Sequence, residues 1–429
     1  MRLLVLMLIF LAGLGLRLDA AWHGSEMNMP DSAAYERIAR GLERDGEFEQ
    51  VGPGTPPQAQ QASNYSPGLP LLVGGIFSIA GENVRLARLL LALISALSIP
   101  LTYLLGLRLQ GLTAGLAGAA IVAFYPTLIG DAGMLLTEPL AGTLLIGAVL
   151  LLLRAKDGDR LAAWVLPGLL FGLTAMVRPE YLGITFLLSL MLLIFGVTKE
   201  RSFRPLAPVA VMLLSALLVI APWTARNFVE MGRLVPISTG GGQTLFAGSY
   251  VPSGGDPQKV VPHLLDSRPM LASAVAEATG KDPQTVPPDR VFSIMAAQTY
   301  PGMDSDAALA LMGRQQYLHE LKRNPLEFTA FIFNKAQRIW WRGRATLTDQ
   351  IPGKLVHWMI VALALAGLVS LARRRPFEFM VITLLFVAAT LVGVIFVASP
   401  RRALVLWPIV SSLSGVGLAL AGSLLIRTR

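Results

Sequence analysis

Residues 133–153 read GMLLTEPLAGTLLIGAVLLLL, and Arg154-Ala155-Lys156 follow at once. The run is long enough to cross a bilayer, because a membrane-spanning helix needs about 20 predominantly apolar residues. It carries one ionisable side chain, Glu138, near the end that lies away from the basic residues. Ionisable groups inside a span are costly and usually face a cavity or a partner. This stretch therefore predicts a transmembrane helix with a functional or paired carboxylate near one end.

Similar apolar runs recur along the whole chain. We predict ten spans, near residues 3–21, 84–107, 112–127, 133–153, 161–177, 180–197, 206–224, 354–372, 377–397 and 402–425. The composition agrees, since 54% of the 429 residues are apolar and 15% are charged, unlike an ordinary soluble domain. The predicted fold class is mainly α: a polytopic membrane protein of about ten transmembrane helices. Interfacial helices are expected in the first outer loop, and a small extracytoplasmic domain between the seventh and eighth helices.

Basic residues cluster on alternate connections between these spans. They are Arg108, Arg154 with Lys156 and Arg160, Lys199 with Arg201 and Arg204, Arg373 to Arg375, and Arg427 with Arg429. The positive-inside bias assigns this side to the cytoplasm. Both termini are then cytoplasmic, and residues 22–83 and 225–351 face outward from a cytoplasmic (inner) membrane. The predicted parts are an N-terminal transmembrane module with the first outer loop (1–224), an extracytoplasmic domain (225–351) and C-terminal transmembrane helices (352–429).

The composition and the motifs exclude several classes of function. No cysteine is present, which rules out disulfides, thiolate metal sites and cysteine nucleophiles. The net charge of +9 lies largely in short cytoplasmic loops and does not indicate nucleic-acid binding. Gly240 to Gly242 lack the Lys-Ser/Thr of a P-loop, so nothing favours a nucleotide-driven mechanism. The N-terminus also resembles a secretory signal, but Arg17 and Asp19 interrupt the region of cleavage, which favours an uncleaved first helix.

Both outward segments contain helical patterns. From Asp31 to Arg44, apolar residues recur at helical spacing, which predicts a short amphipathic helix on the membrane surface. The apolar run 68–80 is too short to cross and predicts a second interfacial or re-entrant helix. In the second segment, residues 307–339 predict a helical stretch that is broken near Pro325. This second segment is the more soluble in character.

Several arginines lie at the outward ends of the spans, where the positive-inside bias disfavours them. They are Arg85, Arg88, Arg178, Arg226, Arg401 and Arg402. Cations held at that depth suggest an anion to bind, and the obvious anion there is a lipid phosphate. A guanidinium grips phosphate oxygens with two parallel hydrogen bonds and stays charged at any working pH. Each arginine could instead be an interfacial anchor that snorkels.

Six stretches, taken in order, resemble one family of membrane enzymes. They are Asp31-Ser32-Ala33-Ala34-Tyr35, Tyr65-Ser66-Pro67-Gly68-Leu69-Pro70, Thr137-Glu138-Pro139, Met176-Val177-Arg178-Pro179, Pro222-Trp223-Thr224-Ala225-Arg226-Asn227 and Asn324-Pro325. Their order and placement resemble the GT-C superfamily of polyprenyl-phosphate-sugar-dependent glycosyltransferases, especially the protein-mannosyltransferase-like and lipid A aminoarabinose-transferase-like members. The resemblance spans nearly the whole chain. It implies transfer of a sugar, with inversion, from a polyprenyl-phosphate carrier to an extracytoplasmic glycan, lipid or protein acceptor.

Such a transfer needs a general base for the acceptor hydroxyl and cations for the departing phosphate. Asp31 is the predicted base, and its alternative role is a helix N-cap. Glu138, in the family's acidic-Pro pair, would orient the acceptor or help hold a divalent metal ion, for which no ligand set is predicted. Asp131 is a third candidate acid, and could equally be a helix cap. The resemblance adds Tyr35 and Tyr65 as substrate-binding residues. The donor phosphate is assigned to Arg85, Arg178, Arg226, Arg401 and Arg402.

Two other classes of function remain open from the sequence. A transporter or flippase of lipid-linked sugars also needs many spans and buried charges, but no paired halves with matching broken helices are apparent. A polysaccharide polymerase or ligase that uses a lipid-diphosphate donor is the nearer rival, because only the motif resemblance argues against it. All three classes share the lipid bilayer and a polyprenyl lipid as partners.

Overall fold

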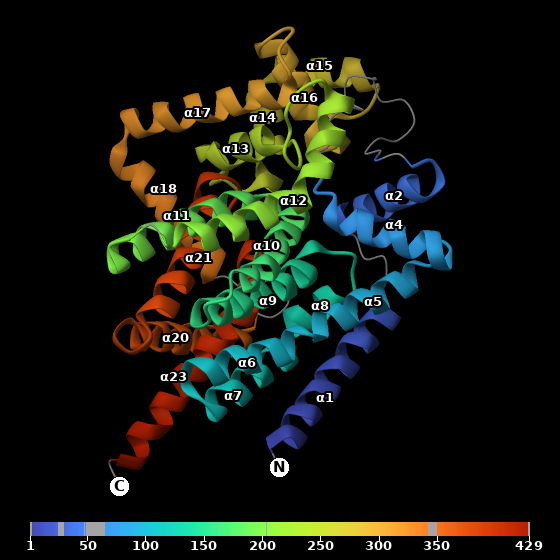
Figure 1. The fold of residues 1–429 in the computed structure, drawn as a ribbon. Coiled ribbons are helices and arrows are strands. Elements are labelled where there is room, and N and C mark those ends of the chain that lie inside the picture. The colour runs from blue at the N-terminus through green and yellow to red at the C-terminus, as the bar shows by residue number, and fades with distance from the viewer. Residues whose placement is uncertain are drawn as a thin grey trace. The chain divides into compact units, whose positions relative to one another are not determined.

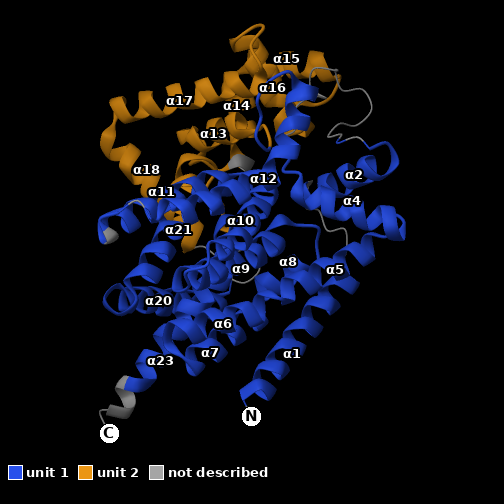
Figure 2. Ribbon diagram, in the orientation of Figure 1, with its two compact units in different colours: residues 1–237, 343–388, 401–429 blue, residues 238–342, 389–400 orange. Residues whose placement is uncertain are grey.

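The computed structural model describes residues 2–24, 30–46, 48, 65–202, 204–341 and 350–427. The polar stretch 52–62 and Arg429 lie outside these residues. The described residues form helices joined by short connections, with no strand among them, which confirms the predicted mainly-α class. They divide into two compact units (Figure 2). Unit 1 comprises residues 1–237, 343–388 and 401–429, and unit 2 comprises residues 238–342 and 389–400.

The long apolar helices match the predicted spans. They are α1 (Arg2–His23), α5 (Val84–Ala96) with α6 (Ser98–Gln110), α7 (Leu112–Phe124) with α8 (Pro126–Ala132), α9 (Thr137–Asp157), η1 (Leu161–Trp164) with α10 (Val165–Val177), α11 (Glu180–Glu200), α12 (Leu206–Met231), α20 (Ile351–Arg374), α21 (Pro376–Ile395) and α23 (Trp407–Arg427). In the described part of the chain, seven helices are long and apolar enough to cross a membrane, or eight if the bent pair α7 and α8 is one span. Leu161–Val177 and Trp407–Ser423 are apolar but shorter, so the count of ten stays a prediction.

Close helix packing holds unit 1 together. Helix α23 packs against α20 and α7, and α10 packs against α12. These approaches require residues without a side chain, since a Cβ at Gly415 would lie 2.2 Å from the carbonyl oxygen of Ala114. Small residues let helices approach closely in a membrane, where packing rather than the hydrophobic effect drives association.

The bend between α7 and α8 has a specific cause and a specific cap. The two helices meet at 55°, where Pro126 has no backbone N–H to donate to the carbonyl of Val122. The buried guanidinium of Arg17, on α1, donates to that carbonyl at 2.7 Å and to the carbonyl of Ala123 at 3.1 Å. Arg17 therefore satisfies carbonyls that the bend leaves without helical partners. Figure 1 shows α1 beside α5, with which it also packs.

The first outer loop contains the two predicted helices. Helix α2 (Pro30–Arg44) packs against α4 (Gly68–Ala80). Arg40 and Arg44 of α2 both form ion pairs with Glu82, which follows α4. At the other end of α2, the hydroxyl of Ser32 accepts from the backbone N–H of Leu135 at 3.2 Å. The Ser32 contact places the first turn of α2 next to the start of α9.

Unit 2 is a separate helical body. Its helices are α13 (Gly241–Ser249), η2 (Val251–Ser253), α14 (Pro257–Ser267), α15 (Pro269–Thr279), η3 (Pro283–Thr285), α16 (Pro288–Thr299), α17 (Ser305–Arg323), α18 (Pro325–Trp340) and the last turns of α21. Phe246, Val260, Leu264 and Phe292 belong to its buried core. The predicted break at Pro325 separates α17 from α18, where the side chain of Asn324 caps α18.

Candidate functional site

Arg401 lies at the centre of the candidate site and binds two carboxylates. It belongs to the short helix α22 (Pro400–Leu404). Its Nη1 donates to Oδ2 of Asp31 at 2.5 Å, and its Nε donates to Oε1 of Glu138 at 2.5 Å. Asp31 comes from the first turn of α2, and Glu138 from the first turn of α9. Three segments that are distant in the sequence therefore meet at one guanidinium.

The ion pairs continue from Glu138 to the junction of α10 and α11. Arg178 lies 3.3 Å from Glu138 and donates to Glu180 at 3.1 Å. Glu180 in turn accepts from Arg402 at 3.2 Å. We call the six residues of these contacts the ion-pair network: Asp31, Glu138, Arg178, Glu180, Arg401 and Arg402. Three guanidinium groups and three carboxylates take part, so their formal charges cancel.

The local sequence explains why these groups lie at helix ends. Arg178 ends α10, and Pro179 separates it from α11, because proline cannot continue a helix. Glu138 and Glu180 each lie in the first turn of a helix, where the macrodipole favours a negative charge. The sequence thus turns at each of these points and leaves a charged side chain in the turn.

The carboxylates of Asp31 and Glu138 differ in their exposure to solvent. The side chain of Glu138 is 1% exposed, whereas that of Asp31 is 38% exposed. A buried charge that loses its partner costs about 3–5 kcal/mol, so Glu138 needs its two arginines. Asp31 keeps a solvent-facing surface while it binds Arg401. A substrate can therefore reach Asp31 and cannot reach Glu138 without displacing other groups.

The electrostatics keep the two central arginines charged. Burial acts to lower the pKa of Arg401, but attraction by Glu138 and Asp31 outweighs it, and the pKa is raised above its usual value. Burial opposes the charge of Arg178 in the same way, and Glu180 and Glu138 again raise its pKa. The network thus holds Arg178 and Arg401 as permanent cations.

Tyr35 and Tyr65 lie together beside the network. Their rings meet edge to face, with centroids 5.3 Å apart. Burial raises the pKa of Tyr35, and the negative charges of Asp31 and Glu138 raise it further. Tyr35 therefore stays protonated and is suited to donate a hydrogen bond, but not to act as a base. Next to Tyr65, the hydroxyl of Ser66 donates to the carbonyl of Val177 at 2.6 Å, which ties this motif to the end of α10.

Other predicted site residues lie elsewhere. The guanidinium of Arg85 stacks on Trp22 at 4.8 Å. The guanidinium of Arg226 lies 5.1 Å from the ring centre of Trp223. These contacts agree with the alternative interpretation of both arginines as anchors. Asp131 is buried in α8, a helix that packs against α1, α5 and α9.

Sequence reasoning did not assign a role to Glu180. In the structure its carboxylate pairs with both Arg178 and Arg402. The signal was present in the sequence, because Glu180 follows Arg178-Pro179 at the outward end of a span. A cation and an anion that flank a helix break at membrane depth are expected to take part in the same charged cluster.

The carboxylates of the network do not fit a metal ion in this arrangement. Among the described residues, no group of three or more His, Asp or Glu side chains lies close enough to hold one. Asp31 and Glu138 instead direct oxygens toward the same guanidinium. We therefore derive no chemical step through a metal ion.

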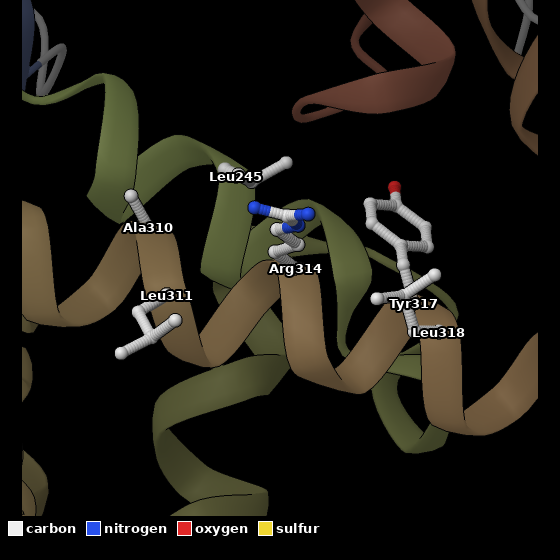
Figure 3. Close-up of a pocket in the computed structure, with 6 residues that line it drawn as sticks. All are labelled: Leu245, Ala310, Leu311, Arg314, Tyr317 and Leu318. Carbon is white, nitrogen blue, oxygen red and sulfur yellow. The ribbon is translucent and has the colours of Figure 1, made fainter.

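An open groove of about 510 Å³ occurs in unit 2. Figure 3 shows Arg314 and Tyr317 on α17 and Leu245 on α13 at this groove. Its lining contains none of the network residues and consists of Leu245, Ala310, Leu311, Arg314, Tyr317 and Leu318. A single arginine among mostly apolar side chains gives it no catalytic pair.

Comparison with known proteins gives one family match and a set of similar structures. Residues 64–225, which include four of the six motifs in whole or in part, match the family model described as dolichyl-phosphate-mannose-protein mannosyltransferase. No curated protein matches the sequence.

The similar structures include the oligosaccharyltransferase AglB of Archaeoglobus fulgidus. Its apo form superposes with a TM-score of 0.57 at 14% sequence identity, covering 98% of this chain. A complex of that enzyme with an inhibitory peptide and a dolichol-phosphate gives a TM-score of 0.55, also at 14% identity and 98% coverage. This chain spans about half of the archaeal enzyme, 50% in both cases. ArnT of Cupriavidus metallidurans is similar at a TM-score of 0.43 and 13% identity, over 96% of this chain and 76% of ArnT.

Proposed function

Because this chain has the GT-C fold of membrane glycosyltransferases, as its motifs predict, we propose that it moves a sugar from a polyprenyl-phosphate carrier to an acceptor outside the cytoplasm. The observation that carries the proposal is the ion-pair network. It combines an accessible carboxylate, Asp31, with arginines from two further helix ends. A transfer from a lipid phosphate needs these two kinds of group: a base for the acceptor and cations for the leaving phosphate.

The proposed reaction is a single displacement at the sugar carbon that bears the phosphate. The acceptor oxygen attacks this carbon and loses its proton to Asp31. The bond between the carbon and the phosphate oxygen breaks, and its electron pair leaves with the polyprenyl phosphate. Arg178, Arg401 and Arg402 stabilise the departing phosphate, since charge-assisted hydrogen bonds to a guanidinium are strong and directional. Attack opposite to the leaving group inverts the sugar carbon.

The paired charges of the network imply an order for donor binding and acceptor activation. Each arginine of the network already binds a carboxylate, so an arriving phosphate competes with these carboxylates for the guanidinium groups. Arg401 can turn to the phosphate by releasing Asp31, the more exposed of its two partners. That release frees the base at the moment when the donor is bound. The donor therefore binds before the acceptor is activated.

The remaining residues support this assignment. Glu138 is too buried to reach an acceptor, and it orients Arg401 and Arg178 instead. Tyr35 lies near the carboxylates and Tyr65 packs against its ring, and both would contact the sugar. The site faces outward from the cytoplasmic membrane, and both termini are cytoplasmic, if the basic connections mark the inner side.

Identification of the bound lipid tests the proposal directly. We expect mass spectrometry of the purified protein to find a polyprenyl monophosphate or its sugar ester. Arg401→Lys should lose this lipid, because lysine keeps the charge but not the two-pronged geometry. Arg226→Lys is the matched control and should retain it, because Arg226 contacts aromatic rings outside the network.

Two other outcomes would replace the proposal. A co-purified polyprenyl diphosphate would favour the polymerase or ligase class. Equal retention of the lipid by the Arg401→Lys and Arg226→Lys variants would remove the network as the phosphate site and would strengthen the transporter class.

A further inference from the structure

Helix α18 of unit 2 has an exposed face with few polar groups. Leu326 is 84% exposed, Phe333 is 61% exposed and Trp341, just after the helix, is 51% exposed. The positions of these residues, together with exposed Ala330 and Gln337, follow the spacing i, i+4, i+7, i+11 and i+15, which places them on one side of a helix. None of the five is charged. The face is therefore unlike the charged surface expected of a helix in water.

The opposite face of α18 is buried within unit 2. Phe331, Lys335 and Ile339 are 7%, 0% and 2% exposed. The ammonium group of Lys335 donates to the carbonyls of Gly248 and Phe396 at 2.7 Å each. This face holds α18 in a fixed orientation, so the exposed apolar face cannot turn inward.

Contacts with α21 place α18 beside the end of a candidate membrane span. The indole N–H of Trp340 donates to the hydroxyl of Thr390 at 2.8 Å, while Lys335 contacts Phe396. Later residues of α18 thus meet earlier residues of α21, and the two helices run in roughly opposite directions. Because α21 is a candidate span that ends at Ile395, α18 descends along the outer end of that span.

The depth of the Trp340–Thr390 contact along the span indicates what covers the exposed face of α18. Thr390 lies five residues before Ile395, which is about 7 Å along a helix at 1.5 Å per residue. An amphipathic helix at a membrane surface buries its apolar face by about 5–10 Å. The uncharged face of α18 matches this environment, and tryptophan is enriched at the same level.

We propose that α18 is a lipid-docking helix: its face of Leu326, Phe333 and Trp341 inserts obliquely into the outer leaflet, with the C-terminal end deepest. The partner is the lipid surface itself, not a second protein. Unit 2 is then held on the bilayer by α18 in addition to its chain connections to the spans. This inference rests on the membrane location of α21 and not on the identity of the transferred group.

Spin labels on single cysteines test the depth of α18, since the chain has no native cysteine. The variants are Leu326→Cys, Phe333→Cys and Gln337→Cys in the full chain, in lipid nanodiscs. Collisions with oxygen report the bilayer interior, and collisions with a polar nickel chelate report water. We expect the ratio of oxygen to nickel collisions to rise severalfold from Leu326 to Phe333 and again to Gln337. Lys281→Cys, at an exposed position of unit 2, is the control and should report water.

Two results would overturn the proposal. If the label at Phe333 reports water as the label at Lys281 does, the face does not enter the membrane. If collisions of both kinds are suppressed and labels on different molecules broaden one another, a second copy of the chain covers the face instead. The three substituted side chains are exposed, so these variants should fold, and an unchanged midpoint of thermal unfolding checks that they do.

Discussion

Asp31 and Glu138 bind the same guanidinium but have different freedom to act. Asp31 has a solvent-facing carboxylate at the first turn of α2, and Glu138 is enclosed by Arg178 and Arg401. A general base must reach the proton that it removes. This difference in exposure supports the proposal that Asp31 is the base and that Glu138 is a positioning residue.

We expect Asp31→Asn to lower turnover by about 100-fold or more, the usual effect of losing such a base. Donor binding should be kept or improved, because the amide no longer competes with the phosphate for Arg401. Single-turnover rates and donor affinity, measured separately, check the two effects. Asp45→Asn, at an exposed position after α2, is the control and should leave both unchanged. Near-normal turnover in the Asp31→Asn variant would limit Asp31 to a structural role.

At the residue scale, the sequence predicts which types of charged side chain form the site better than it predicts which residues pair with one another. Hydropathy placed Arg178, Arg226 and Arg401 at similar depth. Glu180 lies near Arg178 and Trp223 near Arg226 in the sequence, but no neighbour of Arg401 indicates its two carboxylate partners. The difference arises because α2, α9 and α22 converge, and sequence spacing does not encode that convergence. The pairing of Glu180 with Arg402 could not be predicted for the same reason, since the two residues are 222 positions apart.

At the scale of elements, the bend between α7 and α8 depends on a side chain of a different helix. Arg17 reaches from α1 to the carbonyls of Val122 and Ala123. A buried carbonyl that loses its donor costs about 1–3 kcal/mol. Arg17 thereby fixes the position of α8 and of the chain that enters α9.

We expect Arg17→Leu to lower the free energy of unfolding by about 1–3 kcal/mol, because leucine offers no donor to the carbonyl that Pro126 leaves free. Arg17→Lys should cost less, since the ammonium can still donate. Arg85→Leu is the control: it removes only a contact with Trp22, worth about 0.5–1 kcal/mol. Thermal or denaturant unfolding of the purified protein measures the series. Equal midpoints for Arg17→Leu and Arg85→Leu would show that the cap contributes nothing.

The long helices could be predicted well from the sequence, but the breaks between short and long helices could be predicted less well. Apolar length located α9, α11 and α21, and helical spacing with Pro325 located the break between α17 and α18. Hydropathy merged α22 with α23, although a short separate helix presents Arg401 and Arg402. Averaged hydropathy cannot resolve such a break, because the residues on both sides are apolar.

At the scale of the whole molecule, the main prediction concerns which segments lie on which side of the membrane. Basic connections place the first outer loop and the segment between α12 and α20 on the same outward side. Single cysteines at Asp45 and Lys281, both exposed, should therefore react with a membrane-impermeant maleimide in intact cells. Asp159→Cys, between α9 and η1, should react only after permeabilisation. Labelling of Asp45 and Asp159 together in intact cells would contradict this orientation.

The ion-pair network also joins parts of the chain that the ribosome makes at different times. Arg401 follows Asp31 by 370 residues and Glu138 by 263. At about 5–20 residues per second, a ribosome makes Arg401 roughly 10–50 s after Glu138. During this interval Glu138 can pair with Arg178, but Asp31, the proposed base, lacks its guanidinium partner Arg401. Under the proposed function, a nascent chain that stalls before α22 lacks Arg401 and Arg402, so transfer from the lipid carrier would begin only after α22 has been made.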